Sequence, residues 1–187
     1  MAIGRHVARH LLATGALPRR CTYGSAFSGI DTVAAALVAE GVSLQYEFAS
    51  ERRAPLRRVL LDAWGDHGLS VDRCHTDATG EAAVAEAKVS LWVMTAECKK
   101  HSLQYHAGAD EIVCSLASMA RAMHYVGNAC PGLVWIENVS TSETIEKIDA
   151  LVRNADGYAW YRVVLDPWKD LGEPVERERA FWVGVRQ

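Results

Sequence analysis

The chain has 187 residues, of which 50% are hydrophobic and 23% charged, which is typical of a globular domain that can bury a core. Its formal net charge of −3 excludes a strong overall attraction to nucleic acid, so any such contact must use a local patch. No apolar run approaches the roughly 18 residues of a membrane span, and basic residues interrupt residues 1–20, which argues against a membrane protein and a signal peptide. We expect a single domain over residues 1–187.

The five cysteines are odd in number, lie far apart and show no CxxC spacing. They are Cys21, Cys74, Cys98, Cys114 and Cys130. This pattern argues against a zinc site or a disulfide framework, and it favours a reducing, cytoplasmic compartment. His101 and His106 have no set of partner ligands, so we expect no metal site.

The first predicted element is a helix over residues 2–14, where apolar side chains recur at helical spacing and Gly15 follows the end. The next segment, TYGSAFSGIDTVAAALVAEG, indicates a short strand, a turn of small residues and a helix. In the turn, Gly29 allows the backbone to bend tightly or to approach a ligand, and the helix start presents free N–H groups. FSGID lacks the full dinucleotide fingerprint, so a purely structural turn is the alternative.

Residues 44–50 predict a second strand that ends at Glu51, and the helix APLRRVLLDAW follows. A carboxylate at a strand end, roughly 20 residues beyond a glycine turn, is where a βαβ nucleotide site places its ribose ligand. A solvated glutamate is the alternative. Residues 69–79 predict a short third strand that ends near Asp77, and residues 80–88 a helix or turn.

A fourth strand, buried on both faces, is predicted over residues 89–94, and the polar turn after it carries Cys98. Ligands and chemistry gather at the carboxyl ends of such strands in open α/β sheets. Lys99 and Lys100 favour the thiolate of the cysteine, whereas Glu97 disfavours it. Taken alone, this stretch also fits an ordinary loop cysteine.

The rest of the chain continues the alternation. We expect a helix over residues 110–126 and a buried strand over 132–140, which carries Glu137. A further helix follows, and its capping box begins at Ser142 or Thr144. YAWYRVVLD and AFWVGVR then form an antiparallel hairpin, because no helical segment is expected between them.

This alternation predicts an α/β fold with a mostly parallel central sheet, right-handed crossovers, helices on both faces and an antiparallel C-terminal hairpin. The carboxyl ends of parallel strands meet at one edge of such a sheet. We therefore expect the glycine turn, Glu51, Asp77 and Cys98 at a shared edge, with Glu137 beside them.

In this order, the strand ends resemble the motifs of the cytosine-C5 DNA methyltransferases. The similar segments cover residues 23–184 and are SAFSGIDT, FASE, HTDAT, TAECKKHS, WIENVS and DLGEPVERERAFWVGV. The resemblance implies a Rossmann-like fold that uses S-adenosyl-L-methionine (AdoMet). The segment AIGRHVARHLL is similar to the family's final motif, placed first as in circularly permuted members, and a generic amphipathic helix is the alternative.

The resemblance also implies a set of cofactor-binding residues. An aromatic-Ser-Gly turn lies against AdoMet in that family. The corresponding residues here are Phe27, Ser28, Gly29 and Ile30. By the same resemblance, Glu51 holds the ribose hydroxyls and Asp77 binds the adenine amino group.

The catalytic residues implied by the resemblance are Cys98, Glu137, Arg177 and Arg179. The Cys98 thiolate would add to carbon 6 of a cytosine that has left the base stack of DNA, and carbon 5 would then take the methyl group. Glu137 would hydrogen-bond ring nitrogen 3 and the exocyclic amine, and Arg179 would hold the carbonyl oxygen. Arg177 would support the loop or a phosphate.

Three features depart from the family's pattern. Glu97 and Lys99 replace the proline and glutamine around the nucleophile, Val175 replaces the glutamine of the arginine motif, and no target-recognition domain is expected. These departures leave open a split enzyme whose second polypeptide supplies recognition. They also leave open a catalytically diverged regulatory subunit that binds AdoMet or a partner, and an enzyme that modifies cytosine C5 in RNA.

Overall fold

The computed structural model describes residues 2–76, 87–96, 109–172, 174 and 178–187, and within 109–129 the side chains from residue 118 onward. The strands are β1 (Arg20–Ala26), β2 (Ser43–Ser50), β3 (Cys74–His75), β4 (Leu91–Met94), β5 (Leu133–Val139), β6 (Tyr158–Leu165) and β7 (Arg179–Arg186). The helices are α1 (Ala2–Ala13), α2 (Thr32–Ala39), α3 (Ala54–Trp64), α5 (Ala109–Ala129), α6 (Ser142–Arg153) and α7 (Pro167–Leu171).

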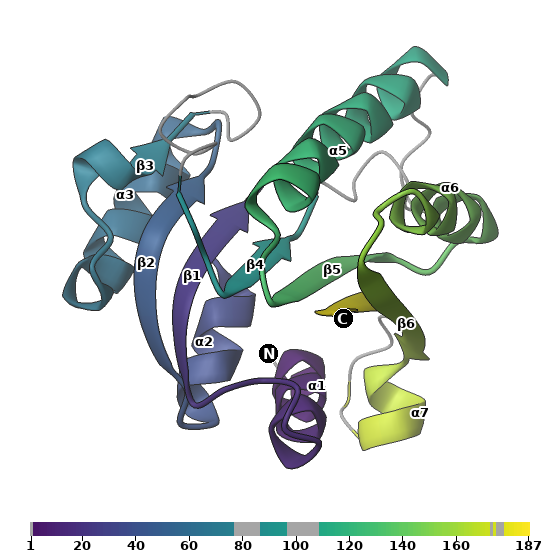
Figure 1. Cartoon of the computed structure of the whole chain (residues 1–187), viewed down its shortest axis with the longest axis horizontal. Helices are drawn as coiled ribbons and strands as arrows, with labels where there is room; N and C mark the ends of the chain where they lie inside the picture. The colour runs from purple at the N-terminus through teal and green to yellow at the C-terminus, as the bar shows by residue number, and fades with distance from the viewer. Residues whose placement is uncertain (1, 77–86, 97–108, 173, 175–177) are drawn as a thin grey trace.

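These strands form one seven-stranded sheet in the order β3-β2-β1-β4-β5-β7-β6 (Figure 1). β3, β2, β1, β4 and β5 run parallel to one another, and β7 is antiparallel to both of its neighbours. The predicted α/β fold with a C-terminal antiparallel hairpin is confirmed. The strand order reverses between β1 and β4, which is the switch point where open α/β sheets bind their ligands.

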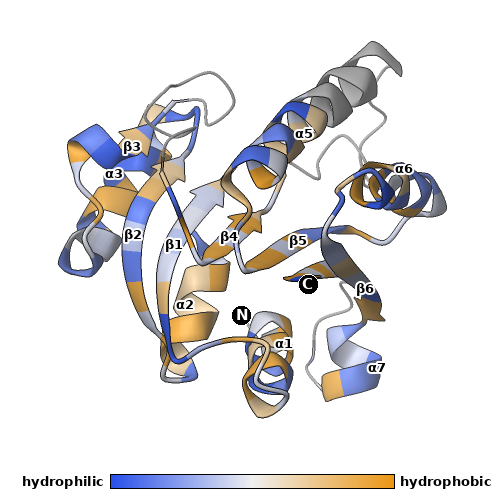
Figure 2. Cartoon of the chain, in the orientation of Figure 1, coloured by the Kyte–Doolittle hydropathy of each residue, from blue (hydrophilic) through white to orange (hydrophobic). Residues whose placement is uncertain are grey.

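Each face of the sheet carries its own hydrophobic core. Alternate strand residues such as Tyr46 and Trp135 face α1, α2 and α3, whereas Phe48 and Trp92 face α5 and α6. Figure 1 shows α1 and α2 on the side of the sheet opposite to α5 and α6. Central α2 is coloured as apolar along most of its length, whereas α3 and α6 carry polar residues on their outer surfaces (Figure 2). The predicted coverage of both faces is therefore confirmed.

The N-terminal helix packs on the first core and against α2. A Cβ atom added at Gly4 would lie 3.1 Å from the Cβ of Ala36, so the two helices approach closely there. The carboxylate of Glu40, at the end of α2, accepts hydrogen bonds from Arg5 at 2.5 Å and Arg9 at 2.7 Å. The predicted N-terminal helix is confirmed, and it packs against α2 and the first hydrophobic core.

The predicted short third strand is present as β3, which has two residues and follows a 3₁₀ turn at Val71–Arg73. Two other local predictions were wrong. The hairpin connection contains α7, because Asp166 caps Trp168 N–H at 3.0 Å and a proline follows in the first helical turn. The cap of α6 is Thr141, not Ser142 or Thr144.

Within the ranges that the structure describes, no helix has the length and apolar character needed to cross a membrane.

Candidate functional site

Strand register brings the predicted site residues to one edge of the sheet. A continuous row of paired residues crosses it and consists of Ser50, Ala26, Met94, Ile136 and Trp182. The next residues along the parallel strands are Glu51 after β2, Phe27 after β1, Thr95 after β4 and Glu137 within β5. The predicted meeting of the glycine turn, Glu51 and Glu137 at the carboxyl edge is therefore confirmed.

The turn between β1 and α2 has an unusual backbone. Phe27, Gly29 and Asp31 have left-handed φ angles of 57°, 57° and 55°. Gly29 adopts this conformation without strain, and a Cβ atom added there would meet no atom within 4 Å, so its outer side faces open space. Phe27 and Asp31 each bear a strain of order 1 kcal/mol or more, which persists only where surrounding contacts enforce it.

Ser28 ties this turn to the end of β2. Its N–H donates to the carbonyl of Ser50 at 2.9 Å, its hydroxyl donates to the same carbonyl at 3.1 Å, and it accepts from Ser50 N–H at 3.2 Å. The hydroxyl also hydrogen-bonds to that of Ser25. Ser28 is 4% exposed, so it acts as an internal clamp, whereas Ile30 is 52% exposed and lies on the surface of the turn.

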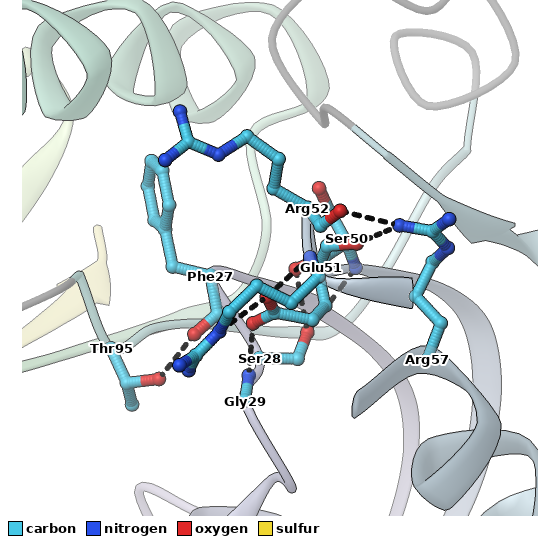
Figure 3. A network of polar contacts seen from close by, with 9 residues as sticks. Phe27, Ser28, Gly29, Ser50, Glu51, Arg52, Arg57 and Thr95 are labelled. Carbon is cyan, nitrogen blue, oxygen red and sulfur yellow. Dashed lines mark hydrogen bonds and ion pairs between the residues drawn. The ribbon is translucent and has the colours of Figure 1, made fainter. Parts of the chain in front are cut away.

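Glu51 is held against the same turn, as Figure 3 shows. One carboxylate oxygen accepts the Gly29 N–H at 3.0 Å, and the other accepts the Arg53 N–H at 2.8 Å, with the Arg53 side chain 3.4 Å away. The Glu51 residue is 7% exposed, and its N–H donates to the carbonyl of His75 in β3. The carboxylate is thus buried, ionically paired and fixed beside the glycine.

Two further side chains brace the loops around the turn. Thr95, directly after β4, donates its hydroxyl to the carbonyl of Phe27 at 3.0 Å. Arg57 in α3 donates to the carbonyls of Glu51 at 2.9 Å and Arg52 at 2.7 Å. In Figure 3 the Arg52 side chain extends toward the ring of Phe27. The sequence motifs did not indicate any of these braces.

Asp31 is a buried acid that the sequence analysis missed. It is 3% exposed and accepts hydrogen bonds from the hydroxyls of Tyr23 at 2.8 Å and Tyr46 at 2.9 Å and from Ala34 N–H at 3.1 Å. Burial raises the pKa of Asp31, against the lowering effect of these hydrogen bonds, and burial likewise raises the pKa of both tyrosines. An Asp directly before an apolar helix is an N-cap signal that could have identified it.

The second half of the site lies where β5 meets β7. Arg179 begins β7 opposite Val139, and its guanidinium lies 3.6 Å from the carboxylate of Glu137. Their side chains are 12% and 25% exposed, so the pair is partly desolvated. The neighbouring Asn138 is 2% exposed and caps the Val139 N–H at 2.8 Å. The expected meeting of Glu137 and Arg179 at this edge of the sheet is therefore present in the fold.

Three predicted site residues, Asp77, Cys98 and Arg177, lie outside the described residues. Their roles stay predictions from the sequence. Cys21, Cys74 and Cys130 are free thiols in the structure, and burial raises the pKa of Cys21 to about 11, so that thiol is unsuited to act as a nucleophile at neutral pH.

The solved structures that resemble this chain include several methyltransferases. The chain superposes on the methyltransferase Dnmt2 of S. pombe with a TM-score of 0.65 and 19% identity, covering 89% of this chain and 50% of that one. A protein provisionally described as a DNA modification methyltransferase, encoded within an E. coli prophage, gives 0.60 and 15%, covering 88% and 46%. Magnesium protoporphyrin IX methyltransferase from Synechocystis, solved with bound SAM, gives 0.59 and 11%, covering 100% and 79%.

These similarities establish the Rossmann-like methyltransferase fold. No protein-family model matches the sequence, and no curated protein matches it. The chain spans about half the length of the first two structures named above.

Proposed function

We propose that this protein transfers the methyl group of AdoMet to carbon 5 of cytosine in DNA. The observation that carries the proposal is the pairing of Glu137 with Arg179 at the edge of the sheet that also holds the Gly29–Glu51 contact. One group of residues is suited to a nucleoside cofactor, and the other to a polar heterocycle. The sequence resemblance supplies the cytosine chemistry, and the fold similarity to Dnmt2 agrees with it.

The residues of the glycine turn fit AdoMet. A nucleoside with a vicinal diol needs an acceptor for its hydroxyls, and Glu51 provides a carboxylate fixed at the end of β2. The open space over Gly29 lets the cofactor approach the backbone, which a Cβ atom would obstruct. Phe27 and Ile30 offer apolar surface beside it. We propose Asp77 as the adenine-binding acid.

When bound, AdoMet supplies the methyl group as an electrophile. On the substrate side, Cys98 adds as a thiolate to carbon 6 of a flipped cytosine, which makes carbon 5 nucleophilic. Glu137 hydrogen-bonds the ring at nitrogen 3 and at the exocyclic amine, and Arg179 holds the carbonyl oxygen. Arg177 supports the loop or a phosphate. Carbon 5 then takes the methyl group, with S-adenosylhomocysteine as the leaving group. A base removes the proton from carbon 5, and the carbon 6–sulfur bond breaks to release the Cys98 thiolate.

The pairing with Arg179 supports this role of Glu137. A guanidinium 3.6 Å away attracts the carboxylate in a partly desolvated setting and so limits its rotation. Both groups project from adjacent hydrogen-bonded strands, which hold binding groups more precisely than loops do.

The test is transfer of a tritiated methyl group from AdoMet to cytosine-containing DNA, with RNA of the same sequence as a second substrate. The chain is assayed alone and together with polypeptides encoded beside it, since target recognition from a second polypeptide is part of the proposal. We expect incorporation by the wild type and none by Cys98→Ala. Equal incorporation by both proteins would refute the assigned mechanism. Labelling of RNA but not of DNA would show that the substrate is RNA.

Calorimetry with AdoMet distinguishes the proposed enzyme from the main alternative, which is a diverged regulatory subunit. Binding of AdoMet without transfer to any DNA or RNA offered, alone or with partner polypeptides, would identify a diverged regulatory subunit. The altered neighbours of the cysteine, Glu97 and Lys99, are the sequence features that favour this alternative. Failure to bind AdoMet would contradict both functions.

A further inference from the structure

The Asp31 carboxylate connects three elements that surround the glycine turn. Tyr23 projects from β1, Tyr46 from β2, and Ala34 from the first turn of α2. Both tyrosines are 0% exposed, and their rings meet edge to face with centroids 4.8 Å apart. β1 leads into the glycine turn and β2 leads into Glu51. The carboxylate thus joins the two strands whose ends form the proposed cofactor site.

The backbone conformation at position 31 suggests that the aspartate side chain has a role there. Asp31 has φ 55° and ψ 62°, a left-handed conformation that glycine adopts without strain. An aspartate there is strained and must also be buried as an acid, which is unfavourable unless its oxygens are bonded. Because three donors reach this carboxylate, its hydrogen bonds offset a cost that glycine would avoid.

The position of Asp31 relates these bonds to ligand binding. Asp31 N–H donates to the carbonyl of Ser28 at 2.7 Å, and Ser28 is clamped to Ser50 at the end of β2. Gly29, between them in sequence, donates its N–H to Glu51. Displacement of Asp31 would therefore rotate the turn and shift the Gly29 N–H relative to the Glu51 carboxylate.

We propose that Asp31, held by the hydroxyls of Tyr23 and Tyr46, is a positioning residue that fixes the glycine turn and Glu51 in the geometry that binds AdoMet. This inference rests on the proposed function, since it concerns the same cofactor site. Asp31 itself is buried and does not contact the ligand, so its effect passes through the turn.

The test measures AdoMet affinity by calorimetry and the midpoint of thermal unfolding for each variant in parallel. Tyr23→Phe and Tyr46→Phe each remove one hydroxyl from the network and should weaken AdoMet binding roughly five- to tenfold. Tyr158→Phe is the matched control, because its hydroxyl donates to the carbonyl of Pro131 at 2.7 Å on the far strand β6. It should lower the unfolding midpoint comparably and leave AdoMet affinity unchanged.

A second pair of variants separates the effect of the carboxylate hydrogen bonds on AdoMet affinity from the effect of the backbone conformation. Asp31→Gly relieves the left-handed strain but removes every bond of the carboxylate, and we expect AdoMet affinity to fall roughly tenfold or more. Asp166→Gly also removes a buried N-cap carboxylate, at α7, but from an extended backbone, and it should leave AdoMet affinity unchanged. Wild-type affinity in Asp31→Gly would overturn the proposal, because the conformation alone would then suffice.

The proposal and the proposed function fail in different ways. If the folded wild type does not bind AdoMet, the proposed function fails. If the wild type binds, Glu51→Gln weakens binding, and both tyrosine variants bind as the wild type does, only the positioning role is overturned. Equal loss of affinity in Tyr158→Phe and the two tyrosine variants would also overturn it, because the effect would then be one of general stability.

Discussion

The two acidic side chains at the carboxyl edge of the sheet are held in different ways. Glu51 is 7% exposed, accepts two backbone N–H groups and is enclosed by contacts from the glycine turn, β3 and α3. The Glu137 side chain is 25% exposed, and its ionic partner Arg179 lies 3.6 Å away. The Glu51 side of the switch point, where we propose the cofactor binds, is built closely around its acid, whereas the other side presents a charged pair with more access to solvent.

This difference follows from what the two halves have to bind in the proposed function. A cofactor is the same molecule in every turnover, so its site can be fixed in advance by hydrogen bonds within the fold. A base that leaves a nucleic acid duplex must enter and leave, so its binding groups need access. The comparison predicts that substitutions in the two halves separate cofactor affinity from transfer.

The largest expected effect comes from Glu137→Gln. The amide cannot match the charge of the carboxylate opposite Arg179, so methyl transfer should fall roughly 10²- to 10³-fold. AdoMet affinity should stay within about twofold of the wild type, since Glu137 lies outside the proposed cofactor site. Tritium incorporation and calorimetry check the two halves of this prediction. A fall in AdoMet affinity as large as the fall in transfer would remove the distinction between the sites.

Glu51→Gln should have the complementary effect. Loss of a charged acceptor for the ribose hydroxyls and for Gly29 N–H should weaken AdoMet binding roughly 10- to 100-fold. Transfer at saturating AdoMet should change much less. Glu47→Gln is the matched control, because Glu47 lies on the same strand but away from the glycine turn. Its carboxylate lies 3.7 Å from the guanidinium of Arg73. Unaltered binding by Glu51→Gln would show that this acid is structural.

Thr95→Val tests the contact between the halves. The substitution keeps the shape of the side chain but removes the hydrogen bond to the Phe27 carbonyl, with an expected loss of about 1 kcal/mol of stability. The thermal midpoint should fall by about 2–4 °C. Valine is nearly isosteric with threonine, so an unchanged midpoint would mean that water replaces the lost donor.

The smallest effect is expected at the α1–α2 contact, which lies away from both acids. The side chains of Arg5 and Arg9 lower the pKa of Glu40 to about 2. A lowered folded-state pKa means that the carboxylate stabilises the fold above its unfolded pKa of about 4.5 and loses that contribution as the pH falls toward 2. The difference in thermal midpoint between wild type and Glu40→Gln should therefore be present at pH 7 and shrink toward pH 3. A constant difference would point to packing in place of charge. AdoMet affinity and transfer should be unaffected.

The proposed cofactor half could be predicted in more detail than the other parts of the molecule. The glycine turn, Glu51 at a strand end and the Glu137 strand follow from local patterns, because strand periodicity and small residues determine where a chain turns at a sheet edge. The hydrogen bonds of the Tyr23 and Tyr46 hydroxyls to Asp31 could not be predicted. Tyrosines that point inward from strands resemble ordinary core residues until their hydrogen-bond partner is known. Thr95 is a similar case, because its acceptor lies on a distant turn.

The errors have equally local causes. The α6 cap was expected at Ser142 or Thr144, but the side chain of Thr141 accepts the Thr144 N–H and begins the helix one residue earlier. α7 was missed because five residues give no periodic pattern, although Asp166 and Pro167 are a typical helix start. Such short elements depend on single capping contacts, which apolar periodicity does not report.

The position of β1 between β2 and β4 also sets the order in which the site can assemble. Its contact with β2 joins residues 22 apart in the chain, such as Ser28 and Ser50, whereas its contact with β4 joins residues 68 apart, such as Phe27 and Thr95. Loops of shorter length close at a lower entropic cost and more quickly. On a chain that emerges from the ribosome, β1 and β2 can therefore pair first, and the backbone N–H and C=O groups on the other edge of β1 stay unpaired until β4 has been synthesised.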